Sequence, residues 1–147
     1  MSSPSTDPPR HVSKADYERL ATFRYALRRF LRFSEDAATQ AGLTPQQHQA
    51  LLAIQGMPDR DYATIGELAE RLQIRPNTAV ELAARLGQEG LLQRETSAED
   101  KRAVHLRLTP EGLEKLRLLS SAHQNELARI GPVLARALNA AIWTAKT

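Results

Sequence analysis

The apolar positions between residues 65 and 108 follow a helical spacing twice and then a strand spacing. The first helical set comprises Ile65, Leu68, Ala69 and Leu72, and the second comprises Ala79, Leu82, Ala83 and Leu86. Steps of three and four positions place each set on one face of an amphipathic helix. Only residues 73–75 separate the two predicted helices, and so short a connection is typical of a helix-turn-helix.

Cap and strand patterns support this interpretation. Thr64 and Glu67 form a capping-box pattern at the start of the first helix, and Pro76 suits the first position of the second. Residues 91–95 and 103–108 then have the composition of two strands joined by a charged loop. A helix, a turn, a helix and a hairpin in this order predict a winged helix.

Long helices are predicted on both sides of this unit. From Lys14 to Ala41 the apolar residues alternate three and four positions apart, which is the spacing of a seam between packed helices. A second long helix begins at Pro110. We expect it to end at Gly131, because Pro132 breaks it and opens a last helix.

The remaining segments are shorter. Thr44 and Pro45 begin a helix that ends near Gly56, and residues 59–63 are predicted to form a turn. Residues 1–12 contain too few apolar side chains to order themselves and are predicted to form a disordered arm.

The predicted architecture is therefore mainly α with a small β-hairpin wing. One domain spans residues 13–147, within which residues 44–109 form the winged helix-turn-helix lobe. Residues 13–43 and 110–147 supply dimerisation helices, because their apolar stripes exceed what a small winged helix can cover. The residues expected at this homodimer interface are Leu20, Phe23, Leu27, Leu127, Leu138, Ile142 and Trp143. Packing of these helices within one chain is the alternative.

Composition limits the function further. The 147 residues include no cysteine and carry a net charge of +3, which favours an anionic partner only mildly. Between residues 60 and 109, eight cations balance eight carboxylates, so the placement of the arginines matters more than the total charge. The sequence shows no catalytic or metal-binding spacing and no apolar run of membrane length. We expect a cytoplasmic protein that is not an enzyme and uses no cofactor or metal.

Several segments, in this order and spacing, resemble the MarR family of bacterial transcriptional regulators. They are Leu68-Ala69-Glu70-Arg71-Leu72, Leu86, Gly90-Leu91-Leu92, Asp100-Lys101-Arg102 and Leu106-Arg107-Leu108-Thr109-Pro110-Glu111-Gly112. The resemblance extends over nearly the whole chain after about residue 14. It implies a homodimer that binds a pseudo-palindromic site on double-stranded DNA, with repression as the expected outcome. It also implies that Arg102 at the wing enters the minor groove and that Asp100 steadies it.

The second helix of the pair would then be the recognition helix. The candidate DNA-binding residues are Arg75, Asn77, Thr78, Val80, Glu81 and Arg85 from this helix, with Lys101 and Arg102 from the wing. Asn77 can pair with adenine, and Val80 can meet a thymine methyl group. Glu81 departs from the family, in which a basic or small polar residue is common here. It can accept a hydrogen bond from cytosine or pair with Arg85 four residues later.

The resemblance further implies release of the DNA by a small aromatic or anionic effector. The candidate effector-binding residues are Arg24, Phe33 and His48, chosen for their expected location. Core packing for Phe33 and a structural hydrogen bond for His48 are the alternatives. A different function also remains open, because the balanced charge and Glu81 suit a winged-helix protein-interaction adaptor or anti-repressor that does not bind DNA.

Overall fold

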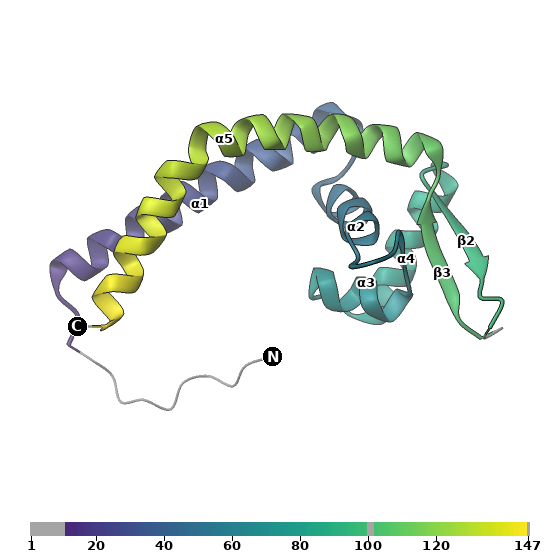
Figure 1. Ribbon diagram of the computed structural model, residues 1–147, viewed down its shortest axis with the longest axis horizontal. Coiled ribbons are helices and arrows are strands. Elements are labelled where there is room, and N and C mark those ends of the chain that lie inside the picture. The colour runs from purple at the N-terminus through teal and green to yellow at the C-terminus, as the bar shows by residue number, and fades with distance from the viewer. Residues whose placement is uncertain (1–10, 100–101, 147) are drawn as a thin grey trace. The chain divides into compact units, whose positions relative to one another are not determined.

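The fold consists of five helices and three short strands in the described residues, which are 11–99 and 102–146 of this computed structural model. The side chains of residues 143–146 are not among them. In chain order the elements are α1 (Lys14–Gln40), α2 (Pro45–Gln55), β1 (Tyr62–Ala63), α3 (Ile65–Leu72), α4 (Pro76–Gln88), β2 (Leu92–Thr96), β3 (Val104–Leu108) and α5 (Pro110–Lys146), as labelled in Figure 1. The winged helix-turn-helix predicted from the sequence is confirmed.

The chain divides into two compact units. The winged unit comprises Arg32–Asn125, and the helical unit combines the described residues up to Leu31 with those from Glu126 onward. α1 and α5 each contribute residues to both units.

Local capping sets the helix starts in the winged unit. The hydroxyl of Thr44 accepts a hydrogen bond from the amide of Gln47, whose side chain accepts one from the amide of Thr44. Thr64 and Glu67 form the same reciprocal box at the start of α3. Each box satisfies amides that have no partner inside the helix, so both helices begin where the sequence predicts.

The turn between α3 and α4 is tight. Gln73 caps α3 in the left-handed conformation, with a φ of 55°. Its side-chain amide donates a hydrogen bond to the carbonyl of Glu70 at 2.7 Å. Ile74 is half-buried and packs against the core, which holds the corner between the two helices.

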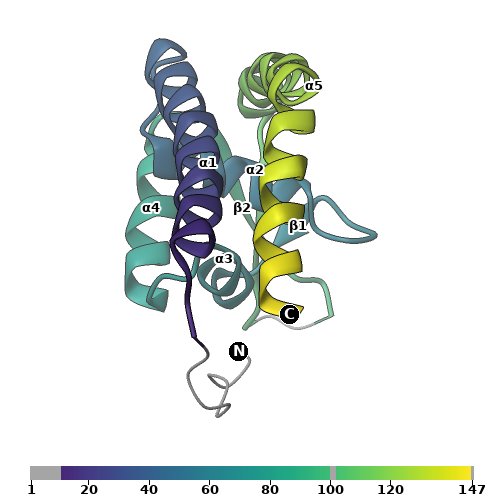
Figure 2. The same cartoon turned by 90° about the vertical axis from the view of Figure 1, so that its left-hand side faces the viewer.

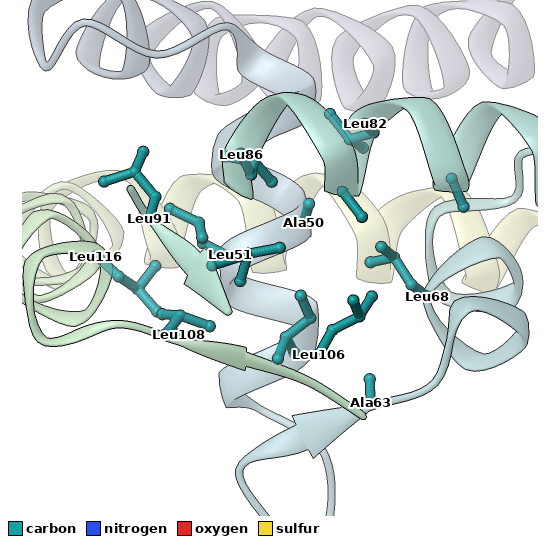
Figure 3. Close-up of a cluster of buried hydrophobic side chains, with 14 of the residues drawn as sticks. Ala50, Leu51, Ala63, Leu68, Leu82, Leu86, Leu91, Leu106, Leu108 and Leu116 are labelled. Carbon is teal, nitrogen blue, oxygen red and sulfur yellow. The ribbon is translucent and has the colours of Figure 1, made fainter. Parts of the chain in front are cut away.

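The core of the winged unit gathers around α2. Leu51 from α2 is fully buried, together with Leu68 of α3, Leu86 of α4 and Leu106 of β3 (Figure 3). Removing four such leucines from water supplies the main stabilisation of the unit, at about 1.5–3 kcal/mol each. α4 is therefore held by its buried side, and its other side is left for contacts outside the unit.

The sheet contains a strand that the sequence did not predict. Tyr62 and Ala63 lie in the segment 59–63, which was expected to be a turn, but they pair with β3 opposite Arg107 and Leu106. Two residues are too few to show an alternating pattern, and this strand exists only because β3 offers an edge for pairing. The strand order is β1-β3-β2, and all pairs are antiparallel.

The expected break at Pro132 is also wrong. α5 runs without interruption through Gly131 and Pro132. Proline removes its own amide hydrogen bond to the carbonyl four residues earlier, and its ring crowds that carbonyl. That residue is Ala128, and both it and Pro132 are exposed, so solvent reaches the turn that loses the bond.

The helical unit pairs the first part of α1 with the last part of α5. These segments run alongside each other in opposite directions, as Figure 2 shows. Ala26, Ile130 and Ala137 are buried there. A hydrogen bond from Arg129 lowers the pKa of Glu126, and the charge of Arg29 on α1 lowers it further.

Candidate DNA interface

The candidate recognition helix α4 has one buried face and one exposed face. Ala79, Leu82, Ala83 and Leu86 are buried. The helical period then directs the predicted DNA-binding residues outward. Of these, Arg75, Asn77, Val80, Glu81 and Arg85 are exposed, and Thr78 is partly exposed. The structure thus brings all six onto the solvent side of one helix.

The start of α4 differs from the starts of α2 and α3. Its N-cap is Arg75, which makes no side-chain capping hydrogen bond, and Pro76 follows at the first helical position. The next amides therefore lack the capping partner that threonine provides in the other two helices. An uncapped helix start beside an arginine has the charge and the donors that bind a phosphate oxygen.

A hollow of about 400 Å³ separates the outer side of α4 from the first turn of α2. The residues that line it are Thr44, Pro45, Gln46 and Gln47 from α2, with Thr78, Glu81, Leu82 and Arg85 from α4. Glu81 and Arg85 lie one turn apart, yet no ion pair between them occurs among the described residues. Of the two roles considered for Glu81, pairing with Arg85 is absent from the structure.

The wing is the hairpin of β2 and β3. Near its tip, the amide of Ser97 donates a hydrogen bond to the carbonyl of Ala103 at 3.0 Å. Arg102 is exposed at this end of the hairpin. Asp100 and Lys101 lie outside the described residues, so the predicted contact between Asp100 and Arg102 stays a prediction.

The base of the wing carries a cluster that sequence reasoning missed. The ring of Tyr62 stacks on His105 with centroids 4.0 Å apart and an angle of 18°. The guanidinium of Arg107 lies 5.3 Å from the Tyr62 ring centroid and forms ion pairs with Glu95 and Asp61. Hydrogen bonding to Glu95 raises the pKa of Arg107. The pairing of β1 with β3 brings these residues together, and no local sequence pattern predicts that pairing.

Two of the three predicted effector residues meet around His123 of α5. The Phe33 ring contacts the His123 ring edge-on at 5.4 Å, and the His48 ring lies 4.9 Å from it. Ser34 lies 2.8 Å from Nε2 of His123, and the carbonyl of Leu119 lies 2.6 Å from Nδ1. His48 is only 2% exposed, and burial, followed by the charge of His123, lowers its pKa. His48 is thus buried, whereas Phe33 is only partly buried and does not belong to the core cluster, so an effector-binding role for either residue stays a prediction.

The third effector residue belongs to the helical unit. Arg24 is exposed on α1 and lines a hollow of about 80 Å³ with Leu27, Arg28 and Leu31. The described contacts therefore do not place Arg24 with Phe33 and His48, and a common effector site stays a prediction.

The predicted dimerisation residues differ in exposure. Leu20, Leu127, Leu138 and Ile142 are exposed, whereas Phe23 and Leu27 are partly buried. Trp143 lies within α5, but its side chain is outside the described residues. Four large apolar side chains thus face solvent in an isolated chain.

Two other kinds of site are absent from the described part of the chain. No group of three or more histidine, aspartate or glutamate side chains there is arranged to hold a metal ion. None of the described helices, α1 and α5 included, is both long enough and apolar enough to span a bilayer.

The chain is similar to known proteins in sequence. The model of the MarR family matches residues 41–103. The HTH-type transcriptional repressor MdtR of Bacillus subtilis (strain 168) is 29% identical over 94 residues, which are 64% of this chain and 59% of that protein. The chain thus matches less than two thirds of the length of this curated relative.

The chain is also similar to known proteins in structure. AbsC, a MarR family transcriptional regulator from Streptomyces coelicolor, has a TM-score of 0.70 and 20% identity, covering 83% of this chain and 82% of AbsC. Sco3205, a MarR family transcriptional regulator from Streptomyces coelicolor in complex with DNA, has a TM-score of 0.68 and 24% identity, covering 83% of this chain and 77% of Sco3205. At these identities the likeness shows a shared fold. The family model, the relative in sequence and this shared fold agree with the resemblance found in the sequence: the match to the MarR family lies within the winged unit, and the described chain has the winged helix-turn-helix fold of MarR family proteins of known structure.

Proposed function

We propose that this chain binds double-stranded DNA as a homodimer and represses transcription from a pseudo-palindromic operator. The observation that carries the proposal is the exposed face of α4, where a helix start without a side-chain cap adjoins a row of polar side chains. Such a face suits the major groove, which admits one α-helix. The relative Sco3205, whose structure includes DNA, has the same fold.

Each candidate residue has a distinct role in this proposal. Asn77 reads an adenine through its amide, and Val80 packs on a thymine methyl group. Thr78 and Arg85, which line the hollow beside α2, contact phosphates and fix the register of α4 on the duplex. Arg75 at the uncapped helix start adds a further phosphate contact. At the wing, Lys101 and Arg102 enter the adjacent minor groove.

The helical unit supports the dimer in this proposal. Its exposed apolar residues on both helices are Tyr17, Leu20, Tyr25, Leu31, Leu127, Val133, Leu138 and Ile142. So many large apolar side chains on one pair of helices are best covered by a second copy related by a two-fold axis. The two copies of α4 would then occupy half-sites about 10 base pairs apart, one turn of the duplex.

The proposal includes an effector that weakens DNA binding. A small aromatic or anionic molecule would have to bind the two conformations of the dimer with different affinity, since only such a difference shifts the equilibrium. Two observations support such an effector: the resemblance to a family that is often released from DNA by small molecules, and the ring contacts of Phe33 and His48 with His123. If a panel of aromatic carboxylates at saturation leaves operator affinity unchanged, the effector is removed from the proposal.

The salt dependence of binding tests the DNA partner directly. If the dimer neutralises roughly eight to ten phosphates, log affinity should fall against log salt with a slope of about −7 to −9. Fluorescence anisotropy with an operator duplex selected from genomic fragments measures this slope. No binding, or a slope near zero, would favour the protein-interaction adaptor, for which the balanced charge of residues 60–109 is the argument.

The wing is tested by removing the arginine near its tip. We expect Arg102→Ala to weaken operator binding by about 1–3 kcal/mol, because a cation lost from a narrow groove leaves its phosphates without a counter-charge. Arg117→Ala is the matched control, since it removes an exposed arginine from α5 that pairs with Glu114. Equal affinities of the Arg102 variant and the wild type would show that the wing takes no part.

A further inference from the structure

The exposed face of α4 carries a carboxylate. α4 is described in full, and Glu81 is its one acidic residue. Glu81 lies four residues after Asn77 and four before Arg85, so the three form one row along the exposed face. A negative charge in the middle of a row that faces DNA must either weaken binding or make a contact that offsets the repulsion.

Glu81 has no partner within the described residues. None of these residues donates a hydrogen bond to Glu81 or forms an ion pair with it, and Arg85 has no ion-pair partner among them either. Elsewhere the chain does form such pairs: Arg32 Nε lies 3.3 Å from Asp36 Oδ1, four residues on. Helical spacing alone therefore does not pair Glu81, and its carboxylate stays available at the edge of the hollow beside α2.

The chemistry of base edges identifies what an available carboxylate can read. An ionised carboxylate only accepts hydrogen bonds. In the major groove guanine presents two acceptors and thymine an acceptor and a methyl group, so both reject it. Adenine presents an amino donor next to the acceptor N7, whereas cytosine presents its N4 amino group alone. Cytosine is therefore the one base that offers the carboxylate a hydrogen-bond donor without an adjacent acceptor on the same base.

We propose, resting on the DNA binding proposed above, that Glu81 accepts a hydrogen bond from the N4 amino group of a cytosine and thereby fixes a C·G pair in each half-site. Glu81 is then a specificity-determining residue. At the other bases the carboxylate meets an acceptor, which in adenine lies beside an amino donor, so Glu81 discriminates mainly by disfavouring other sequences. Because Arg85 is not held by Glu81, Arg85 is available for the phosphate contact proposed for it.

Selection from a randomised duplex library tests this assignment. The wild type should yield a two-fold symmetric consensus with a cytosine at one fixed position of each half-site. Glu81→Gln should replace that cytosine with adenine, because a glutamine amide pairs with the N6 and N7 atoms of adenine. Glu81→Ala should lose the preference at that position alone. Changing the C·G pair in one half-site should weaken wild-type binding roughly 5- to 150-fold and Glu81→Ala binding little.

Glu70→Gln is the matched control, because it removes the same charge from an exposed position of α3. It should keep the wild-type consensus, and equal melting temperatures of all variants would show that the exposed substitutions leave folding intact. If the wild type and Glu81→Ala select the same bases at every position, or the wild type selects no cytosine that depends on Glu81, the assignment is overturned. A wild type that selects no sequence at all would instead overturn the DNA binding itself.

Discussion

Replacing Leu51 with alanine is expected to lower the free energy of unfolding of the winged unit by about 2–5 kcal/mol. Leu51 is 0% exposed and lies on α2, at the centre of the core that also holds Leu68, Leu86 and Leu106. The substitution removes buried methyl groups and leaves a cavity that the surrounding side chains cannot fill completely. Because the buried side of α4 packs on this core, the same change should weaken the support of the candidate recognition helix.

Leu52 supplies a matched control for this experiment. It is the next residue on α2, but it is 45% exposed. Leu52→Ala should therefore change the free energy of unfolding by no more than about 0.5 kcal/mol. Urea unfolding followed by circular dichroism, at one fixed protein concentration, compares the two variants. Equal losses for Leu51→Ala and Leu52→Ala would contradict the position of α2 at the centre of the core.

The parts of the fold that the sequence predicts are those that depend on neighbouring residues. The capping boxes at Thr44 and Thr64 are local, because donor and acceptor lie three residues apart. The buried face of α4 is also local, since a period of 3.6 residues fixes which side chains share a side. For this reason the exposed side chains of the candidate interface, Asn77 and Arg85 among them, were identifiable before the structure.

The parts that the sequence does not predict depend on distant residues. Strand β1 exists through its pairing with β3, more than 40 residues later, and so does the stack of Tyr62 on His105. The contact between His48 and His123 joins α2 to α5 in the same way. For Pro132, the general rule that proline ends a helix is overridden where the turn before it is exposed. Most of the features that local sequence patterns fail to predict therefore arise from contacts between residues far apart in the chain.

Hydrogen bonds hold the junction between the wing and α5, where the sequence has the segment Thr109-Pro110-Glu111-Gly112. Thr109 donates its hydroxyl to the carbonyl of Gly90 at 2.6 Å, and its amide donates to the carbonyl of Leu91 at 3.1 Å. The amide of Gly112 in turn donates to the Thr109 hydroxyl at 3.1 Å. These bonds draw the first turn of α5 against the backbone that connects α4 to β2. The segment Thr109-Pro110-Glu111-Gly112 therefore joins the wing to α5.

Gly112→Ala is expected to lower the free energy of unfolding by about 2–4 kcal/mol. Helix propensity alone would predict the opposite sign, since alanine stabilises a helix interior by about 1 kcal/mol relative to glycine. A Cβ at position 112, however, would lie 2.2 Å from the carbonyl oxygen of Leu91 and 3.1 Å from its carbon. Both atoms belong to the backbone, so α5 must move away and strain or lose the amide bond from Thr109. The steric term exceeds the propensity term.

Gly131 makes this argument testable within the same helix. A Cβ at position 131 would meet no atom within 4 Å. Gly131→Ala should therefore raise the free energy of unfolding by up to about 1 kcal/mol, as propensity predicts. Urea unfolding of both variants gives the two signs, and hydrogen exchange at the Thr109 amide should become faster only in Gly112→Ala, as its bond to Leu91 opens. A Gly112→Ala variant as stable as the wild type would show that α5 does not approach the α4–β2 connection this closely.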